Sequence, residues 1–194
     1  DSRASNCAYY NLIREALTLP PLSAEEEEYC HMASVHESLA RIIPPRRLEE
    51  ALEICRRIDY RKKILPLLRP EDGLGEALIR LENWGLRLAV CTNRSDSVRE
   101  LLRYFRLESF FDPIKTVDNG DPKPSPGGLL DIARQWQVFP GQIAFVGDSL
   151  VDQQAAAGGD IPFWSFRNPD LPAQAHFTDF SGLIAGVAPL VERS

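Results

Sequence analysis

The sequence predicts an α/β fold, in which a small helical domain accompanies a parallel sheet covered by helices on both faces. Two observations lead to this prediction. From about Pro70 onward, short apolar strands alternate with amphipathic helices, the pattern of a parallel sheet. Before Pro70, helical patterns follow one another with no strand between them. We therefore expect a helical domain over residues 3–69 and an α/β core over residues 70–194.

Three helices are expected in the first domain. Apolar residues recur at helical spacing over 9–17, and Pro20-Pro21 ends that helix. Ser23 and Glu26 have the spacing of a capping box, which opens a second helix whose apolar face continues to Ile43. A third helix over 48–58 places an apolar stripe against a charged back.

The alternation in the second domain gives four strands and four helices. Gly85 closes the first helix, because glycine favours the left-handed conformation that ends helices. The expected helices cover 74–84, 95–105, 125–136 and 150–157, and the expected strands cover 86–91, 114–117, 143–146 and 161–166.

Composition excludes several classes of partner. The chain has 194 residues, 44% hydrophobic content and a formal net charge of −6, which argues against a nucleic acid as the main partner. No apolar run approaches the roughly 20 residues that cross a bilayer, so no membrane partner is expected. The four cysteines lack paired or metal-ligand spacing and resemble buried thiols, which indicates a reducing, cytoplasmic location.

Polar side chains follow three of the expected strands at the edge where an open parallel sheet binds ligands. Thr92 to Ser95 follow the first strand and lead into a helix, an arrangement that can bind a phosphoryl oxygen. Lys123 lies between Pro122 and Pro124, which restrict its backbone and direct its ammonium group. Asp148 and Asp152 follow the strand at 143–146 and offer oxygen ligands suited to Mg²⁺.

Each of these features also has a simpler explanation. Thr92 to Ser95 and Asp148-Ser149 could be ordinary helix caps, and Lys123 could be a solvated surface charge. The joint pattern favours a site, because hydroxyl, amine and carboxylate occur in order, each at a strand exit and about one strand-helix unit apart.

Four stretches carry a resemblance to a known family. LAVCTNRSDS (88–97), FRLESFFD (105–112), GDPKPSPGGLLDIARQW (120–136) and IAFVGDSLVDQQAAAGG (143–159) are similar in order and spacing to the haloacid dehalogenase-like (HAD) superfamily, in particular its phosphoglycolate phosphatase-like group. The resemblance implies a Rossmann-like core with an inserted α-helical cap, which would close over the substrate. It also implies a Mg²⁺-dependent phosphatase of a small phosphorylated metabolite.

The resemblance assigns roles to five residues. Thr92 would hydrogen-bond the transferring phosphoryl group with help from the Asn93 backbone. Lys123 would neutralise the phosphate and the nucleophile. Asp148 would bind Mg²⁺, and Asp152 would brace that metal site without binding the ion.

One departure concerns the family's first motif, a strand ending in D-x-D-G-T that supplies the aspartate nucleophile and an aspartate acid/base. It is absent from the 194 residues, and Asp1-Ser2 reads as the D-S pair that follows it in many members. We therefore expect an upstream segment that carries the nucleophile. Because the missing strand is the middle one of the family's sheet, its absence should leave two unpaired strand edges.

Three alternatives stay open. A hexose-phosphate mutase similar to β-phosphoglucomutase would share the fold, but its E-D-S-x-x-G motif differs from the Gly147-Asp148-Ser149-Leu150-Val151-Asp152 found here. A haloacid dehalogenase needs no metal and would leave Asp148 without a role. A catalytically inactive, truncated binding protein is the literal reading of the missing strand.

Overall fold

The structure, a computed structural model, describes residues 3–192 and divides into two compact units, Asp1–Glu71 and Asp72–Ser194. We call them the helical unit and the core unit. Asp1 and Ser2, which the sequence relates to the end of the first motif, lie outside the described residues. Within 3–192, no helix has the length and apolar character needed to cross a bilayer.

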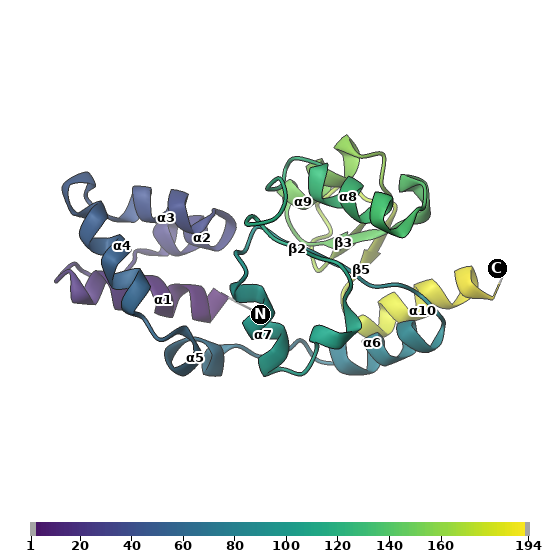
Figure 1. Cartoon of the computed structure of the whole chain (residues 1–194), viewed down its shortest axis with the longest axis horizontal. Coiled ribbons are helices and arrows are strands. Elements are labelled where there is room, and N and C mark those ends of the chain that lie inside the picture. Colours follow the sequence, from purple (N-terminus) through teal and green to yellow (C-terminus); the bar gives the residue numbers. More distant parts are fainter. Residues whose placement is uncertain (1–2, 193–194) are drawn as a thin grey trace. The chain divides into compact units, whose positions relative to one another are not determined.

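The helical unit is a small bundle built around α1 (Figure 1). Its elements are α1 (Arg3–Ala16), α2 (Ala24–Met32), α3 (Val35–Ile42), η1 (Pro45–Arg47), α4 (Leu48–Arg57), α5 (Tyr60–Lys63) and η2 (Leu65–Leu67). Tyr10 and Ile13 of α1, with Leu17 just after it, are buried in one apolar cluster with residues of α2, α3 and α4. Sequence periodicity located the apolar face of α1 because helical neighbours three and four positions apart share one side.

The second predicted helix is in fact two helices, so that prediction was wrong at one point. α2 ends at Met32 and α3 begins at Val35, with Ser34 as its N-cap. The Ser34 side chain accepts a hydrogen bond from the Glu37 N–H at 3.3 Å, and Glu37 Oε2 accepts one from the Ser34 N–H at 2.9 Å. This capping box is visible in the sequence, but the continuous apolar stripe concealed it. The capping box at Ser23 and Glu26 is present as predicted.

The core unit alternates helices and strands. Its helices are α6 (Leu74–Asn83), α7 (Ser97–Tyr104), α8 (Gly127–Trp136), α9 (Leu150–Gly158) and α10 (Phe180–Val191), with short 3₁₀ helices η3 (Glu108–Phe110) and η4 (Pro140–Gln142). Its strands are β1 (Val90–Cys91), β2 (Ile114–Lys115), β3 (Phe145–Gly147), β4 (Phe163–Phe166) and β5 (Ala175–Phe177). Gly85 follows α6 with φ +74°, the left-handed conformation expected of it. Neither β5 nor α10 was predicted from the sequence. In α10, Gly182, Gly186 and Pro189 weaken the helical signal.

Within the described residues, the strands form two parallel sheets. β1 pairs with β2, and β4 lies between β3 and β5. The register places Val90 opposite Ile114, Val146 opposite Trp164, and Trp164 opposite Ala175. Every pairing is parallel, as the alternating pattern predicted. β1 is shorter than the expected strand over 86–91.

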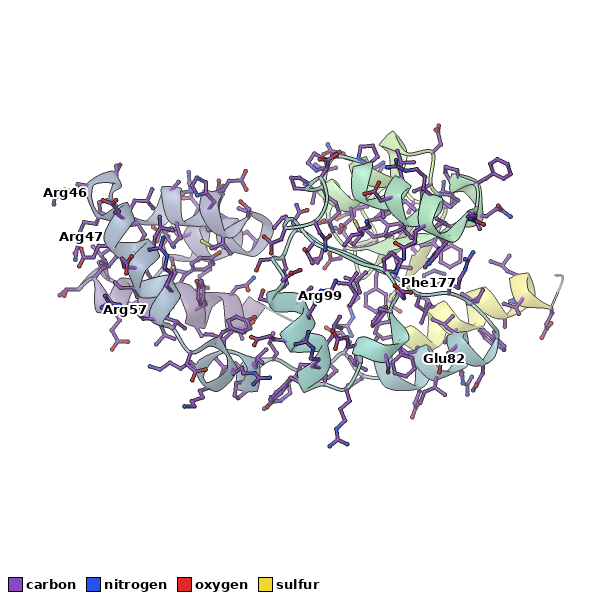
Figure 2. All side chains as sticks on the ribbon, viewed as in Figure 1. Arg46, Arg47, Arg57, Glu82, Arg99 and Phe177 are labelled. Atoms are coloured by element: carbon purple, nitrogen blue, oxygen red, sulfur yellow. The ribbon has the colours of Figure 1, made fainter. Side chains whose placement is uncertain are left out.

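The two faces of the core unit differ. On one face, a single apolar cluster under α8 and α9 includes Cys91 of β1 and Phe145 of β3, so both sheets share one helical layer. Gly128 allows this approach, because a Cβ there would lie 3.0 Å from Cys91 Sγ. On the other face the core is divided. Val90 packs with α7 in one cluster, while Phe177 packs with α6 and α10 in another (Figure 2).

The facing edges of β1 and β3 carry no strand partner within residues 3–192. Val90 N–H and Thr92 N–H donate to β2, so the alternate residues Ala89 and Cys91 direct their backbone groups away from it. On β3, the Phe145 N–H donates to the Pro162 carbonyl just before β4, so the backbone groups of the next residue, Val146, point toward the other edge of the strand. Val146 is 38% exposed although its strand reads as a buried one. We call residues 89–91 and 144–146 the strand slot.

The second capping box gives a stability prediction. Replacing Ser34 with Ala should lower the free energy of unfolding by about 1 kcal/mol, because the Glu37 N–H loses its acceptor. Asp at the same position keeps an acceptor and should restore most of the loss. Urea unfolding followed by far-ultraviolet circular dichroism measures both variants. Equal stability of the Ala and Asp variants would contradict the assignment of this helix start.

Candidate active site at the carboxyl edge of the strands

Lys123 connects three elements of the core unit. Its amine contacts Asp152 Oδ1 of α9, donates to the Cys91 carbonyl of β1 at 3.2 Å, and lies 5.4 Å from the centre of the Phe145 ring of β3. The Lys123 side chain is 12% exposed and that of Asp152 is 6% exposed. A buried charge requires a paired and hydrogen-bonded partner, so this ion pair fixes the position of the ammonium group.

Asp152 holds Lys123 with one oxygen and the end of β3 with the other. Asp152 Oδ2 accepts hydrogen bonds from the Ser149 hydroxyl at 2.6 Å, the Ser149 N–H at 3.1 Å and the Asp148 N–H at 3.3 Å. Gly147 makes room for it, because a Cβ there would lie 2.6 Å from Asp152 Cβ. The resemblance predicted that Asp152 supports a metal site without binding the ion. The structure adds a direct bond to the lysine that the sequence analysis did not foresee.

Asp148 lies at the tip of β3 with its side chain exposed. Its backbone carbonyl accepts a hydrogen bond from Asn168 Nδ2 at 2.8 Å. No hydrogen bond or ion pair to its carboxylate occurs among residues 3–192, so both oxygens can coordinate a cation. These oxygens suit Mg²⁺. The described residues contain no group of three or more His, Cys, Asp or Glu side chains placed to hold a metal.

Thr92 and Asn93 follow β1 directly. The Thr92 N–H donates to the Lys115 carbonyl at 3.0 Å, which continues the ladder with β2. Its hydroxyl oxygen accepts from the Arg94 N–H at 3.1 Å. The Asn93 side chain pairs with the Lys123 backbone, accepting from N–H at 2.7 Å and donating to C=O at 2.8 Å. A continuous set of contacts thus joins Thr92 to Asp148.

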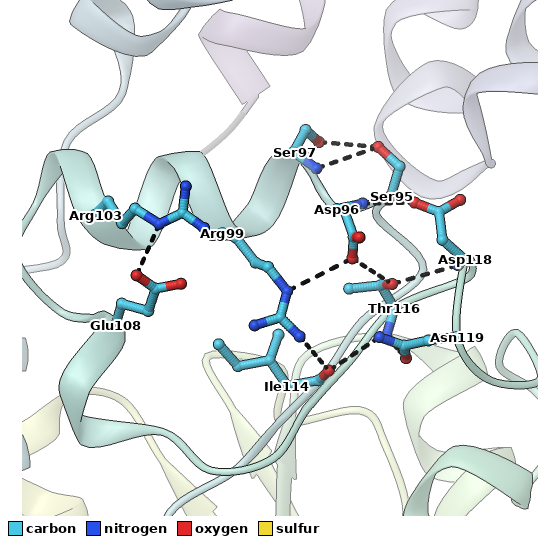
Figure 3. Close-up of polar contacts among 10 residues, drawn as sticks. All are labelled: Ser95, Asp96, Ser97, Arg99, Arg103, Glu108, Ile114, Thr116, Asp118 and Asn119. Atoms are coloured by element: carbon cyan, nitrogen blue, oxygen red, sulfur yellow. Dashed lines mark hydrogen bonds and ion pairs between the residues drawn. The ribbon is translucent and has the colours of Figure 1, made fainter.

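A second polar network, which the sequence analysis missed, fixes the loops after β1 and β2 (Figure 3). The Asp96 N–H donates to Asp118 Oδ2 at 2.7 Å, and the Thr116 hydroxyl donates to Asp96 Oδ1 at 3.1 Å. Asn119 accepts from the Thr116 N–H at 2.9 Å and donates to the Ile114 carbonyl at 3.3 Å. The available signal was the polar run Thr116-Val117-Asp118-Asn119 after a strand. The network joins the loop after β2 to the N-terminal end of α7.

Cys91 lies beside Lys123 but is not set up as a nucleophile. Burial is the main cause that raises the pKa of the Cys91 thiol, and the nearby Lys123 charge opposes it less strongly. The thiol therefore stays protonated at neutral pH, and a thiol is a far weaker nucleophile than a thiolate.

Gly147 provides a test of the packing behind Lys123. Gly147→Ala should destabilise the core unit by about 2 kcal/mol, because the new methyl group collides with Asp152. Gly141→Ala is the matched control. Nothing lies within 4 Å of the added methyl at that position, and we expect a change of less than about 0.5 kcal/mol. Thermal unfolding of the two variants compares them, and a tolerated Gly147→Ala would refute the close contact.

The buried ion pair gives a second test. Lys123→Met should lower the free energy of unfolding by about 3 kcal/mol, because Asp152 is left buried without its cation. Adding Asp152→Asn to it should recover more than half of the loss. Lys115→Met is the control, since the Lys115–Asp131 pair is longer, at 3.5 Å, and more exposed. Chemical denaturation measures these three variants and Asp152→Asn alone, and a loss in the double variant equal to the sum of the two single losses would show that the two side chains are not coupled.

Comparison with known proteins places this geometry in a family. The haloacid dehalogenase-like hydrolase family matches residues 1–165. A phosphoglycolate phosphatase from Nitrosospira multiformis is 34% identical over 111 residues, which cover 56% of this chain and 48% of that protein. The tyrosine-protein kinase PtkA of Mycobacterium tuberculosis is 30% identical over 142 residues, which cover 70% of this chain and 48% of that protein. The chain thus spans about half the length of each relative.

The solved structures agree with this relationship. The crystal structure of a HAD-superfamily hydrolase of subfamily IA, variant 1, from Geobacter sulfurreducens has a TM-score of 0.81 and 35% sequence identity, covering 96% of this chain and 90% of that one. The fold is the α/β fold with parallel sheets that the sequence predicted. With its family match over most of its length, the chain belongs to the haloacid dehalogenase-like hydrolases.

Proposed function

We propose that this chain belongs to a Mg²⁺-dependent phosphatase that hydrolyses a small phosphate monoester through an aspartyl-phosphate. The observation that carries the proposal is the position of the buried Lys123 amine at the carboxyl ends of β1 and β3, where it contacts both the Cys91 carbonyl and Asp152 Oδ1. The phosphoglycolate phosphatase relative supports hydrolysis of a phosphate ester.

The donors around Lys123 suit the oxygens of a phosphoryl group. An ammonium group has three N–H donors, and two are used on Cys91 and Asp152. We assign the third to a phosphoryl oxygen. The Thr92 oxygen accepts from Arg94, so its own hydrogen remains to be donated. Because both polar groups of the Asn93 side chain are used on Lys123, Asn93 would bind phosphate through its backbone N–H. Such preorganised donors stabilise the charge of the transition state.

Asp148 is the residue that would hold Mg²⁺. The bound ion would neutralise charge on the phosphoryl oxygens and orient the group. Asp152 would keep Asp148 in place through the Asp148 N–H. It would serve as a support rather than a ligand, because its two oxygens already contact Lys123 and the 148–149 turn.

The proposal requires an aspartate nucleophile, and we assign it to a strand of the D-x-D-G-T type that fills the strand slot. A parallel strand there would pair with the open edges of β1 and β3 and would end at the same edge as Lys123 and Asp148. Two observations support this assignment. Val146 is exposed, and the two apolar clusters on its face are separate. One apolar strand would cover Val146 and join the clusters.

The reaction then takes two steps. The aspartate oxygen attacks phosphorus in line, and the bond from phosphorus to the substrate oxygen breaks, so that an aspartyl-phosphate forms. The second aspartate of the D-x-D-G-T motif would donate a proton to the leaving oxygen, which departs as an alcohol, and would take a proton back from the attacking water in the second step. Water next attacks the same phosphorus, and the aspartate leaves with inorganic phosphate as product. Lys123 and Thr92 would contact the phosphoryl oxygens throughout both steps.

The substrate is proposed to be a small phosphorylated metabolite, with phosphoglycolate as the nearest analogue. The basic run on this unit gives no added support for a polyanion. Arg56 and Arg57, the second of which is labelled in Figure 2, are exposed and paired with Glu53. Exposed pairs of this kind are typical of a solvated helix surface.

A tyrosine kinase is the second candidate function, because PtkA covers 70% of this chain. Incubation of the full-length protein with ATP and a tyrosine-containing peptide separates the two functions. Phosphate transfer to the peptide favours the kinase. Release of phosphate from monoesters without transfer favours the phosphatase.

The test of the phosphatase is turnover of para-nitrophenyl phosphate and phosphoglycolate by the full-length protein with and without Mg²⁺. Asp148→Asn should lower kcat about 100-fold or more, because Mg²⁺ loses a charged ligand. Asp160→Asn is the matched control. It has φ +53°, a conformation that asparagine tolerates, and it precedes β4 at the opposite edge. Retained Mg²⁺-dependent turnover in Asp148→Asn would refute the metal assignment.

A further inference from the structure

We propose that the Asn93 side chain is a positioning residue that fixes the Lys123 loop to the end of β1, an inference that rests on the proposed function. The amide of Asn93 makes two hydrogen bonds to the same residue. Asn93 Oδ1 accepts from the Lys123 N–H at 2.7 Å, and Asn93 Nδ2 donates to the Lys123 C=O at 2.8 Å. This pairing copies the exchange between two strands, but a side chain takes the place of one backbone.

The pairing matters because the loop has few other attachments. Among the described residues, the remaining hydrogen bonds from 120–124 to distant parts of the core unit are made by the Lys123 amine itself. Pro122 and Pro124 restrict local dihedral angles but do not attach the loop to the sheet. Without Asn93, the hydrogen bonds between residues 120–124 and distant parts of the core unit would come from the Lys123 amine alone. That amine is the group whose position has to be fixed.

Two attachments of different kinds therefore act on Lys123. Asn93 fixes where the backbone begins, and Asp152 fixes where the amine ends. A lysine side chain has several rotatable bonds, and each ordered bond costs conformational entropy. When the backbone is fixed, that cost is met on folding rather than on substrate binding. The third N–H of the amine then points in one direction before a ligand arrives.

The chain contains a chemically matched control. The Asn119 side chain also makes two hydrogen bonds to the backbone, but to two residues shortly before it: it accepts from the Thr116 N–H at 2.9 Å and donates to the Ile114 C=O at 3.3 Å. Asn119 lies in the same connection between β2 and α8 as Lys123, but its two side-chain hydrogen bonds stay within residues 114–119 (Figure 3). Loss of Asn119 removes comparable hydrogen bonds at the same edge of the sheet but leaves the attachment of Lys123 intact.

The experiment compares Asn93→Ala, Asn93→Asp and Asn119→Ala by acetylation. The rate at which acetic anhydride modifies Lys123 is read by mass spectrometry, with Lys115 as the internal reference. Asn93→Ala and Asn93→Asp should raise the rate at Lys123 roughly fivefold or more, since hydrogen bonds that restrain it are lost. In Asn119→Ala that rate should stay within about twofold of the wild type. An unchanged rate in Asn93→Ala, or an equal rise in Asn119→Ala, overturns the inference.

Kinetics of the full-length protein form the second readout. Asn93→Ala should lower kcat about tenfold with little change in KM, because a displaced lysine weakens binding of the transition state more than that of the substrate. Faster acetylation with unchanged kcat overturns the positioning role. If the wild-type protein hydrolyses no phosphate ester, the proposed function fails, and the acetylation rates alone then decide whether Asn93 fixes Lys123.

Discussion

The contact between Lys123 and Asp152 is the interaction on which the site depends. It joins the loop before α8 to the first turn of α9, and through Cys91 and Phe145 it also reaches β1 and β3. Little of either side chain is exposed, so neither charge is well solvated. Removal of either side chain would therefore leave the other charge buried without a partner. Gly147 is explained by the same contact, because the space beside it holds the Asp152 carboxylate. The same contacts of Asp152 therefore determine both the packing at the end of β3 and the position of the charges in the site.

This arrangement divides the two aspartates of the 148–152 turn into different chemical roles. Asp152 uses its oxygens on Lys123, Ser149 and the turn backbone, which leaves it little capacity for a cation. Asp148 is exposed, and residues 3–192 offer its carboxylate no hydrogen bond or ion pair. The sequence alone shows two carboxylates four positions apart, which could equally form a shared metal site. The side-chain contacts favour one ligand and one support.

The sequence was most informative where periodicity and strand exits carry the signal. Thr92, Lys123 and Asp148 could be located because each follows a strand, and parallel strands end at one edge of a sheet. Contacts between side chains could not be predicted. Nothing in the spacing of Asn93 and Lys123 shows that an amide pairs with a peptide group. α10 was missed for another reason: its glycines and Pro189 lower helix propensity, and packing against α6 compensates (Figure 1).

The division of the core on one face connects stability with the proposed chemistry. α8 and α9 cover both sheets with one apolar cluster, whereas the opposite face has separate clusters and an exposed Val146. A strand in the slot would supply backbone hydrogen bonds to both open edges and apolar contacts to Val146. In the proposed enzyme, the same strand would bring the aspartate to the edge where Lys123 and Asp148 already lie. Completing the sheet and completing the active site would then be one event, because the residues proposed to bind phosphate are already held in place by contacts that do not involve the added strand.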